Sequence, residues 1–295
     1  MRRLTLAALA GSLALVLAAP APAPAAEAAL SFDKLLKQAE ADNAEAQFLL
    51  GVMELSTRKN PVAAVKWLQR AAGKGHDGAR IMLAALLFRG QGVAADPKRA
   101  VALLKAAADQ GRADAQVMLG QASLDGRIGK RDEAEALKWF SAAADKGSAE
   151  GRINLGMMRL NGLGGPADAA AAAALFRTAA EQGSVDGRFN LGMLTLRGVG
   201  TPADSAAAAE WLRKAAEAGH AGAQFNLGLL HVVGEGVPVD RTLAVKWLAL
   251  AAARGTGEVK LRADEKIRQL TEPLGASAMA DGFEAARVWM ERHQG

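Results

Sequence analysis

Cysteine and tyrosine are absent from this 295-residue chain, and aromatic residues make up only 4% of it. Without cysteine the chain can form no disulfide and offers no thiol for a lipid anchor, so its stability must come from packing alone. The scarcity of aromatic and β-branched residues argues against a sheet protein, whereas abundant Ala, Leu, Lys, Arg and Glu favour helices. We therefore predict an all-α fold.

A strong net charge is also missing. The chain carries 36 basic and 31 acidic residues, a formal net charge of +5, and both signs are dispersed along it. Nucleic-acid-binding domains concentrate basic residues on one face or stripe. We therefore expect no nucleic-acid partner.

The N-terminus has the pattern of a secretory signal peptide. Arg2 and Arg3 precede an apolar run over residues 4–19, and Ala23-Pro24-Ala25 provides an A-x-A cleavage site. That run is shorter than the roughly 20 residues of a membrane-spanning helix, although an uncleaved anchor is the alternative. We predict a Sec-type signal peptide over residues 1–25 and a periplasmic protein with no stable membrane insertion after cleavage. Secretion beyond the periplasm stays open.

Six copies of one pattern fill most of the remaining chain. Trp or Leu recurs every 36 residues, an Ala pair follows four and five residues after it, and a Gly follows eight residues after it. The anchors are Trp67, Leu103, Trp139, Leu175, Trp211 and Trp247, and the glycines are Gly75, Gly111, Gly147, Gly183, Gly219 and Gly255. Leu-Gly pairs recur upstream, as Leu119-Gly120 and Leu155-Gly156 illustrate. Such a period predicts stacked units that share one core.

Each repeated position has a physical reason. Asn60, Asp96, Asp132, Asp168, Asp204 and Asp240 precede an Ala-rich segment and are expected to cap a helix N-terminus. Gly90, Gly126, Gly162, Gly198 and Gly234 fall where the preceding helix must stop, and glycine adopts the left-handed conformation cheaply. The Ala pairs allow neighbouring helices to approach closely, with the Trp or Leu anchor expected to fill the space beside them. Each unit is therefore predicted to be a helical hairpin.

The combined pattern, seen in full from Ala223 to Gly255, resembles the Sel1-like repeat, a relative of the tetratricopeptide repeat. The resemblance implies a right-handed α/α superhelical solenoid. We divide residues 40–255 into six repeats, at about 40–75, 76–111, 112–147, 148–183, 184–219 and 220–255. The Tyr usual three residues after Leu-Gly is replaced by Ser123, Arg159, Thr195 and His231, a change that we expect the fold to tolerate.

After Gly255 the period ends, and residues 256–295 are predicted to form C-terminal capping helices. One amphipathic helix is expected from Glu258 to Leu270 and another from Ser277 to His293, separated by a break at Thr271-Glu272-Pro273. A cap covers the apolar face that a terminal repeat would expose. It favours a monomer over a self-assembling solenoid.

Residue patterns typical of catalysis or metal binding are weak. His76 and His220 lie four repeats apart, too far to share a metal, and His231 and His293 are isolated. Ser31-Phe32-Asp33-Lys34, Ser56-Thr57-Arg58-Lys59 and Lys146-Gly147-Ser148 loosely match the motifs of penicillin-recognising enzymes, but no Ser-Asp-Asn accompanies them. We therefore expect that the protein is not an enzyme and that it binds no metal and no cofactor.

Two polar positions in the first helix of each repeat are the candidate partner-binding residues. They comprise Arg80, Gln116, Arg152, Arg188 and Gln224, together with Asn154, Asn190 and Asn226. Asn can pair with the backbone of an extended peptide and Arg with carboxylates. The alternative is that both positions are structural, and one sequence does not show which of them faces the concave side.

These features predict an exported adaptor or regulator that binds a protein or peptide on the concave face of the solenoid. The resemblance suggests envelope signalling or envelope assembly as the context, with an envelope protein as partner. The alternative function is a cell-wall or β-lactam ligand binder or hydrolase.

Overall fold

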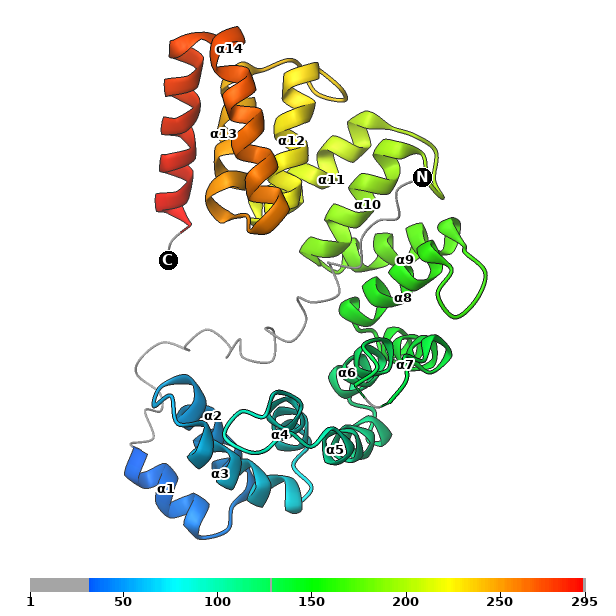
Figure 1. Cartoon of the computed structure of the whole chain (residues 1–295), viewed down its shortest axis with the longest axis vertical. Helices are drawn as coiled ribbons and strands as arrows, with labels where there is room; N and C mark the ends of the chain where they lie inside the picture. Colours follow the sequence, from blue (N-terminus) through cyan, green and yellow to red (C-terminus); the bar gives the residue numbers. More distant parts are fainter. Residues whose placement is uncertain (1–31, 128, 294–295) are drawn as a thin grey trace. The chain divides into compact units, whose positions relative to one another are not determined.

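The computed structural model describes residues 32–127 and 129–293, apart from the side chains of residues 272–274. This part of the chain is helical and contains no strand (Figure 1). The helices are α1 (Phe32–Glu40), α2 (Ala44–Ser56), α3 (Pro61–Gly73), α4 (Asp77–Arg89), α5 (Pro97–Asp109), α6 (Ala113–Leu124), α7 (Glu133–Asp145), α8 (Ala149–Asn161), α9 (Ala169–Glu181), α10 (Val185–Arg197), α11 (Ser205–Glu217), α12 (Ala221–Val233), α13 (Arg241–Arg254) and α14 (Gly257–Arg292). The predicted all-α solenoid of helical hairpins is confirmed.

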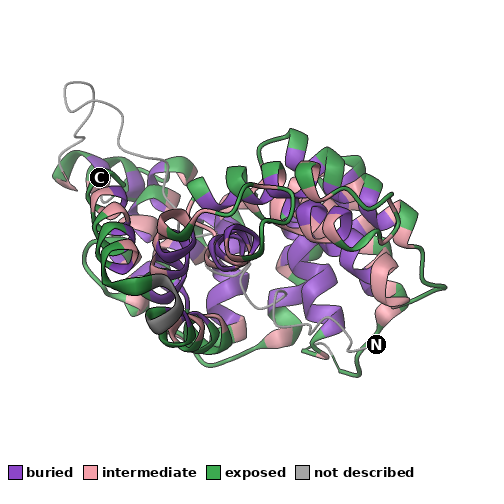
Figure 2. Ribbon diagram, turned by 90° about the horizontal axis from the view of Figure 1, so that it is seen from above, coloured by how far each residue is buried: buried purple, intermediate pink, exposed green. Residues whose placement is uncertain are grey.

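The helices form two compact units. Unit 1 extends from α1 to residue 154 and includes residues 163–165, whereas unit 2 holds residues 155–162 and residues 166 onward. Each hairpin has a first helix (α2, α4, α6, α8, α10, α12) and a second helix (α3, α5, α7, α9, α11, α13). Within each unit, the contacts run chiefly between helices adjacent in the sequence, and buried residues lie on the helix sides that meet a neighbour (Figure 2).

The predicted N-caps are all present. Asn60, Asp96, Asp132, Asp168, Asp204 and Asp240 each accept a hydrogen bond from the backbone N–H three residues later, over distances of 2.8–3.1 Å. Pro61 and Pro97 occupy the first turns of α3 and α5, where a missing N–H costs nothing. These caps explain why every second helix begins at the same point of the repeat.

The fold tolerates the residues that replace the usual Tyr three residues after Leu-Gly. The backbone carbonyls of Ser123, Arg159, Thr195 and His231 each accept a hydrogen bond from the N–H of the following cap residue, over 2.8–3.1 Å. This bond closes the loop between the two helices of a repeat. It involves only backbone atoms, so the identity of the side chain at this position does not alter it.

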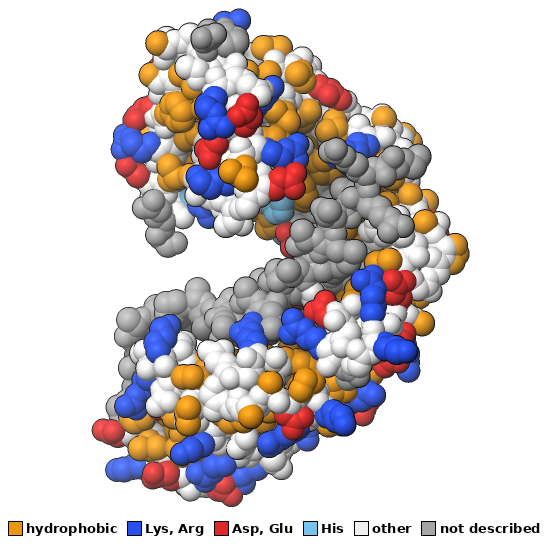
Figure 3. Space-filling view, in the orientation of Figure 1, with side chains coloured by type: hydrophobic (Ala, Val, Ile, Leu, Met, Phe, Trp, Pro, Cys, Tyr) orange, Lys and Arg blue, Asp and Glu red, His pale blue; other side chains and the backbone are white. Residues whose placement is uncertain are grey.

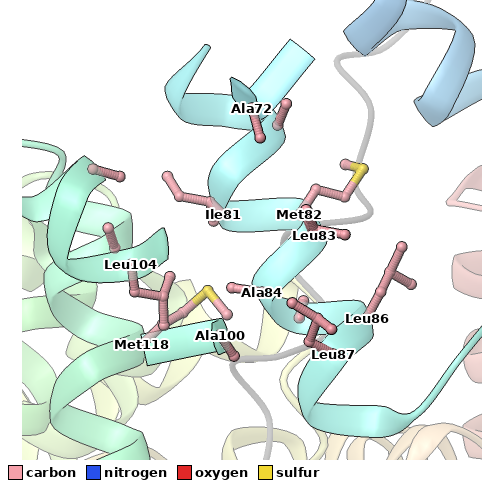
Figure 4. Close-up of a cluster of buried hydrophobic side chains, with 14 of the residues drawn as sticks. Ala72, Ile81, Met82, Leu83, Ala84, Leu86, Leu87, Ala100, Leu104 and Met118 are labelled. Atoms are coloured by element: carbon pink, nitrogen blue, oxygen red, sulfur yellow. The ribbon is translucent and has the colours of Figure 1, made fainter. Parts of the chain in front are cut away.

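One expectation about the core is wrong. The Trp or Leu anchor is generally not the residue that fills the space between the helices. Trp67, Trp139 and Trp211 are only half-buried, and each ring lies beside an Arg or Lys side chain. Trp247, which is 5% exposed, is the exception among these tryptophans. The filling residue is the next one along. Leu68, Leu104, Phe140, Phe176, Leu212 and Leu248 are at most 1% exposed. Figure 4 shows Leu104 among the buried residues of α3 to α6.

The glycine of each Leu-Gly pair makes room for this filling residue. A Cβ on Gly120 would lie 2.7 Å from Cε1 of Phe140, and one on Gly156 would lie 2.6 Å from Cε1 of Phe176. The Ala pairs allow one repeat to approach the next closely. At the start of α10, a Cβ on Gly187 would lie 2.7 Å from the backbone nitrogen of Ala180 in α9. The predicted close approach at the Ala pairs is confirmed.

The array begins with a half-repeat that the sequence analysis did not identify. Helix α1 occupies the place of a second helix, since Leu35 and Ala39 are buried at the positions that Leu68 and Ala72 hold one repeat later. Asp42 replaces the turn glycine with a φ of 72°. Its carboxylate accepts a hydrogen bond from Lys74 at 2.6 Å, which lowers the pKa of Asp42. Helix α1 therefore covers the outer face of the first repeat.

The C-terminal part differs from the prediction in one respect. Helix α14 continues through Thr271, whose hydroxyl donates to the carbonyl of Ile267, and its non-helical residue is Gly275, with φ 78° and ψ 162°. The predicted break at residues 271–273 is thus displaced to a glycine that tolerates this backbone conformation. Beyond it, the helix packs on α13, where Gly282 lies against Val245.

None of the helices in the described residues is both long enough and apolar enough to cross a membrane. The predicted signal peptide over residues 1–25 lies outside the described residues.

Candidate partner-binding face

The predicted Gln residues tie one repeat to the previous one. Gln116 Nε2 donates to the carbonyl of Ala108 at 3.5 Å, and Gln224 Nε2 donates to the carbonyl of Ala216 at 3.1 Å. Gln47 makes the same bond to Ala39 at 3.0 Å. Each acceptor lies eight residues earlier, in the last turn of a helix whose carbonyls lack helical partners. All three glutamines are buried, so they stabilise the stack and offer little to a partner.

Arg80 and Arg152 at the same position are also held by the chain itself, although they are partly accessible. Arg80 Nη1 donates to Asp77 Oδ1 at 2.8 Å, and Arg152 Nη1 donates to the carbonyl of Gly147 at 3.0 Å. Arg188 is half-buried, and its Nε atom is fully buried without a hydrogen-bond partner among the described residues. Lys260 in α14 continues this position, donating to the carbonyl of Ala252 at 3.2 Å. The position is primarily a link between repeats.

Two of the three predicted Asn residues bind within their own helix. Asn154 Nδ2 donates to the carbonyl of Glu150 at 3.0 Å, and Asn226 Nδ2 donates to that of Gly222 at 2.7 Å. Asn154 is buried, whereas Asn190 and Asn226 are partly exposed. In Asn154 and Asn226, the bond from Nδ2 fixes the amide and leaves the Oδ1 atom as an acceptor. In repeats one to three the same position is apolar, with Leu49, Met82 and Met118.

Further residues share the faces of Asn190 and Asn226. Positions three and seven residues later lie on the same side of a helix. They are Met193 and Arg197 on α10, and Leu229 and Val233 on α12, all at least partly exposed. Val233 is an apolar side chain with 66% of its surface exposed. We name the set Asn190, Met193, Arg197, Asn226, Leu229 and Val233 the amide face.

The four members of the amide face that are not Asn were not predicted from the sequence. Their signal was present, since Met193 and Leu229 lie three residues after the repeated Asn. The mixture of two amides, apolar side chains and one guanidinium suits a peptide backbone with apolar side chains. On the visible surface, acidic and basic side chains are interspersed in both units (Figure 3).

Among the residues that loosely matched catalytic motifs, Ser31 lies outside the described residues, and Ser148, Lys146 and Gly147 have ordinary structural roles. Ser148 Oγ caps α8 by accepting from the Gly151 N–H at 3.0 Å, and Lys146 and Gly147 form the turn that precedes it. Ser56 lies at the exposed end of α2, next to Thr57. Across residues 32–127 and 129–293, no three His, Cys, Asp or Glu side chains gather as metal ligands.

Comparison with known proteins decides the family. The Sel1 repeat model matches six segments, at residues 44–76, 78–111, 113–148, 149–184, 185–220 and 221–256. The chain belongs to the Sel1 repeat family. Sel1 repeats are generally scaffolds for protein–protein interaction, and proteins built from them are typically non-enzymatic.

Two solved structures of Sel1 proteins are similar to this chain. One is a protective antigen of uropathogenic Escherichia coli strains that displays this fold, with 31% identity and a TM-score of 0.71. The match covers 88% of this chain and 56% of that protein, so this Sel1 chain spans little more than half of it. The other is a Sel1 repeat protein from Oxalobacter formigenes, with 24% identity, a TM-score of 0.66, and coverage of 78% of this chain and 89% of that one. A comparison with curated proteins gives no match.

Proposed function

We propose that this Sel1 protein is an exported, non-enzymatic adaptor or regulator that binds a protein or peptide of the cell envelope through the amide face. Export rests on the signal-peptide pattern of residues 1–25. Binding rests on the family, whose members are generally interaction scaffolds. The observation that carries the location is the repetition of a partly exposed amide on successive first helices of unit 2, at Asn190 and Asn226, of which the Asn226 amide is held by the carbonyl of Gly222.

The chemistry of the amide face favours an extended segment of a partner. The Oδ1 atoms of Asn190 and Asn226 can accept hydrogen bonds from backbone N–H groups, which every peptide offers irrespective of sequence. Met193, Leu229 and Val233 then provide apolar contacts for alternate side chains. Arg197 adds one charged contact and favours a partner with a carboxylate near this end.

The experiment begins with crosslinking in cells that export the tagged protein, followed by capture and mass spectrometry. The chain and an Asn190→Ala/Asn226→Ala variant are compared. The matched control is Thr178→Ala/Thr271→Ala. Both threonines are exposed, and their side chains, like that of Asn226, donate to the carbonyl four residues earlier. We expect one envelope protein to be enriched with the chain and the control, and to be reduced about ten-fold or more in the Asn variant, since two buried interface hydrogen bonds are lost.

Two results would contradict the proposal. Equal enrichment by the Asn variant would show that the partner binds elsewhere. Covalent labelling of the protein by a fluorescent penicillin, with no enriched protein partner, would replace the proposal by the cell-wall or β-lactam alternative.

A further inference from the structure

His220 joins the last two repeats of the array by three contacts. It is the N-cap of α12, and its Nδ1 atom accepts a hydrogen bond from the backbone N–H of Ala223 at 2.9 Å. Its ring stacks on Phe189 of α10, with a centroid distance of 4.2 Å and an interplanar angle of 27°. Its Nε2 atom faces Asp186 Oδ1 of α10 at 3.6 Å. One imidazole therefore both begins α12 and attaches it to α10.

The cap bond is compatible with only one protonation state. Nδ1 accepts from an N–H, so it must carry a lone pair, and the proton of the neutral ring must lie on Nε2. A second proton would place an N–H on Nδ1, directed at the N–H of Ala223, and would abolish the cap. It would also put a positive charge at the positive end of the α12 dipole.

The surroundings of His220 favour its neutral form. Burial lowers the pKa of His220, and Asp186 acts in the opposite direction without cancelling this effect. The neighbouring second helices contribute charges of both signs, Glu217 near the end of α11 and Arg254 at the end of α13, whose guanidinium lies next to Gly219. A base whose pKa is lower in the folded state stabilises the fold above its unfolded pKa of about 6.5. That stabilisation is lost as the pH falls through and below this value.

The other repeat junctions are built differently. Ser148 and Ser184 cap α8 and α10 with hydroxyls that do not titrate, and Arg112 makes no cap bond to α6. His76 repeats the arrangement at the first junction, with Nδ1 capping Ala79 at 3.1 Å and its ring stacked on Phe48. There, however, Nε2 lies only 2.9 Å from Glu45 Oε2.

The closer carboxylate gives the His76 junction a compensating contact. Protonation would lose the cap but turn the contact with Glu45 into a full ion pair. The other charges there are already paired, Lys74 with Asp42 and Asp77 with Arg80. At His220 the carboxylate is 3.6 Å away, beyond hydrogen-bond distance, so a smaller gain offsets the lost cap.

We propose that the junction between α10 and α12 is a pH-sensitive joint, at which protonation of His220 releases the first turn of α12 and loosens its contact with Phe189. Acidification then changes the attachment of the last repeat, whereas the Ser-capped junctions keep theirs.

The test measures hydrogen exchange of the purified full chain at about pH 8 and about pH 5, on either side of the unfolded histidine pKa. Rates are converted to protection factors, which removes the intrinsic dependence of exchange on pH. We expect protection of the amides of residues 222–224 to fall about five-fold at the lower pH, the effect of losing one N-cap. Protection at the start of α10, capped by Ser184, should stay constant.

The decisive control is His220→Ser, which installs the cap that Ser148 and Ser184 already provide. This variant should keep the protection at α12 and lose its pH dependence. Nitrogen chemical shifts of the histidine rings give an independent readout, and His220 should show the Nε2–H tautomer at the higher pH. An unchanged α12 in the original chain, or an equal loss in His220→Ser, would overturn the proposal.

Discussion

At the scale of single residues, the glycine of each Leu-Gly pair sets how closely the two helices of a repeat approach. Gly120 faces the ring of Phe140, and a Cβ atom built on it would lie only 2.7 Å from Cε1 of that ring. Repeat two departs from this rule, since Ala84 takes the glycine position and faces Leu104. The helices of repeat two thus accommodate a Cβ opposite Leu104, whereas a Cβ built on Gly51 or Gly228 would lie 2.6 or 2.8 Å from Cγ of the opposing Leu.

We predict that Gly120→Ala destabilises the protein by about 1–3 kcal/mol, because the added methyl group displaces a ring that has no free space. The free energy of unfolding measured with urea would show this. Gly73→Ala, at the end of α3 where a Cβ meets nothing within 4 Å, is the matched control and should cause no loss. Adding Phe140→Leu to Gly120→Ala should recover stability, as it reproduces the Ala84–Leu104 pair. Additive losses in the double variant would contradict this account.

Residue roles were predicted well where local chemistry determines them. The Asp and Asn caps follow from a hydrogen bond within four residues, and their sequence pattern identified all six. The identity of the filling residue depends on the angle at which two helices meet, which the period does not contain. The large and infrequent Trp consequently appeared to be the core residue, although the adjacent Leu68 or Phe140 position is the buried one.

At the scale of helices, the bond from a first helix to the preceding second helix links successive repeats. Gln224 makes this bond to Ala216, and its side chain is fully buried. From the sequence, these regularly spaced polar residues were predicted to bind a partner. A polar residue repeats with the same spacing whether it contacts a partner or links two repeats. The hydrogen bond to the carbonyl eight residues earlier, in the Ala pair, distinguishes the linking role from the binding role, and this bond is evident only once the helix packing is known.

We predict that Gln224→Met, which preserves length and volume, lowers the free energy of unfolding by about 1–2 kcal/mol. The link from the side chain of residue 224 to the carbonyl of Ala216 would then be lost, and this oxygen would keep only bonds from backbone N–H groups, such as that of Gly219. Thermal or urea unfolding followed by circular dichroism measures the change. Gln269→Met on the exposed side of α14 serves as the control and should alter stability by no more than about 0.5 kcal/mol. Equal effects of the two substitutions would show that the link to Ala216 contributes nothing.

At the scale of the whole molecule, the repeat period predicted the stack but not its ends. Helix α1 lacks the Ala pair and the turn glycine, so its nine residues carry too little of the pattern to be recognised as a second helix. The break in α14 was assigned to Pro273, but the backbone turns at Gly275. Both differences arise at the ends of the array, where the constraint of the period ends.

Contacts in such an array run between neighbours, so the effect of a damaged end should remain local. Leu35 of α1 is buried in a small cluster with Ala39, Ala46 and Leu50. We predict that Leu35→Ala destabilises this cluster by about 2–3 kcal/mol, at the low end for a buried Leu because the site is at an edge. Hydrogen exchange should then quicken in α2 and α3 and stay unchanged in α12 and α13.

The control for this prediction is Leu261→Ala on α14, where the side chain is 69% exposed and should affect neither end. Faster exchange throughout the chain in Leu35→Ala would mean that the six repeats unfold as one cooperative body. A local effect would instead mean that each end of the array opens independently. The pH-dependent attachment of α12 at His220 could then act on the last repeat while the first repeats stay folded.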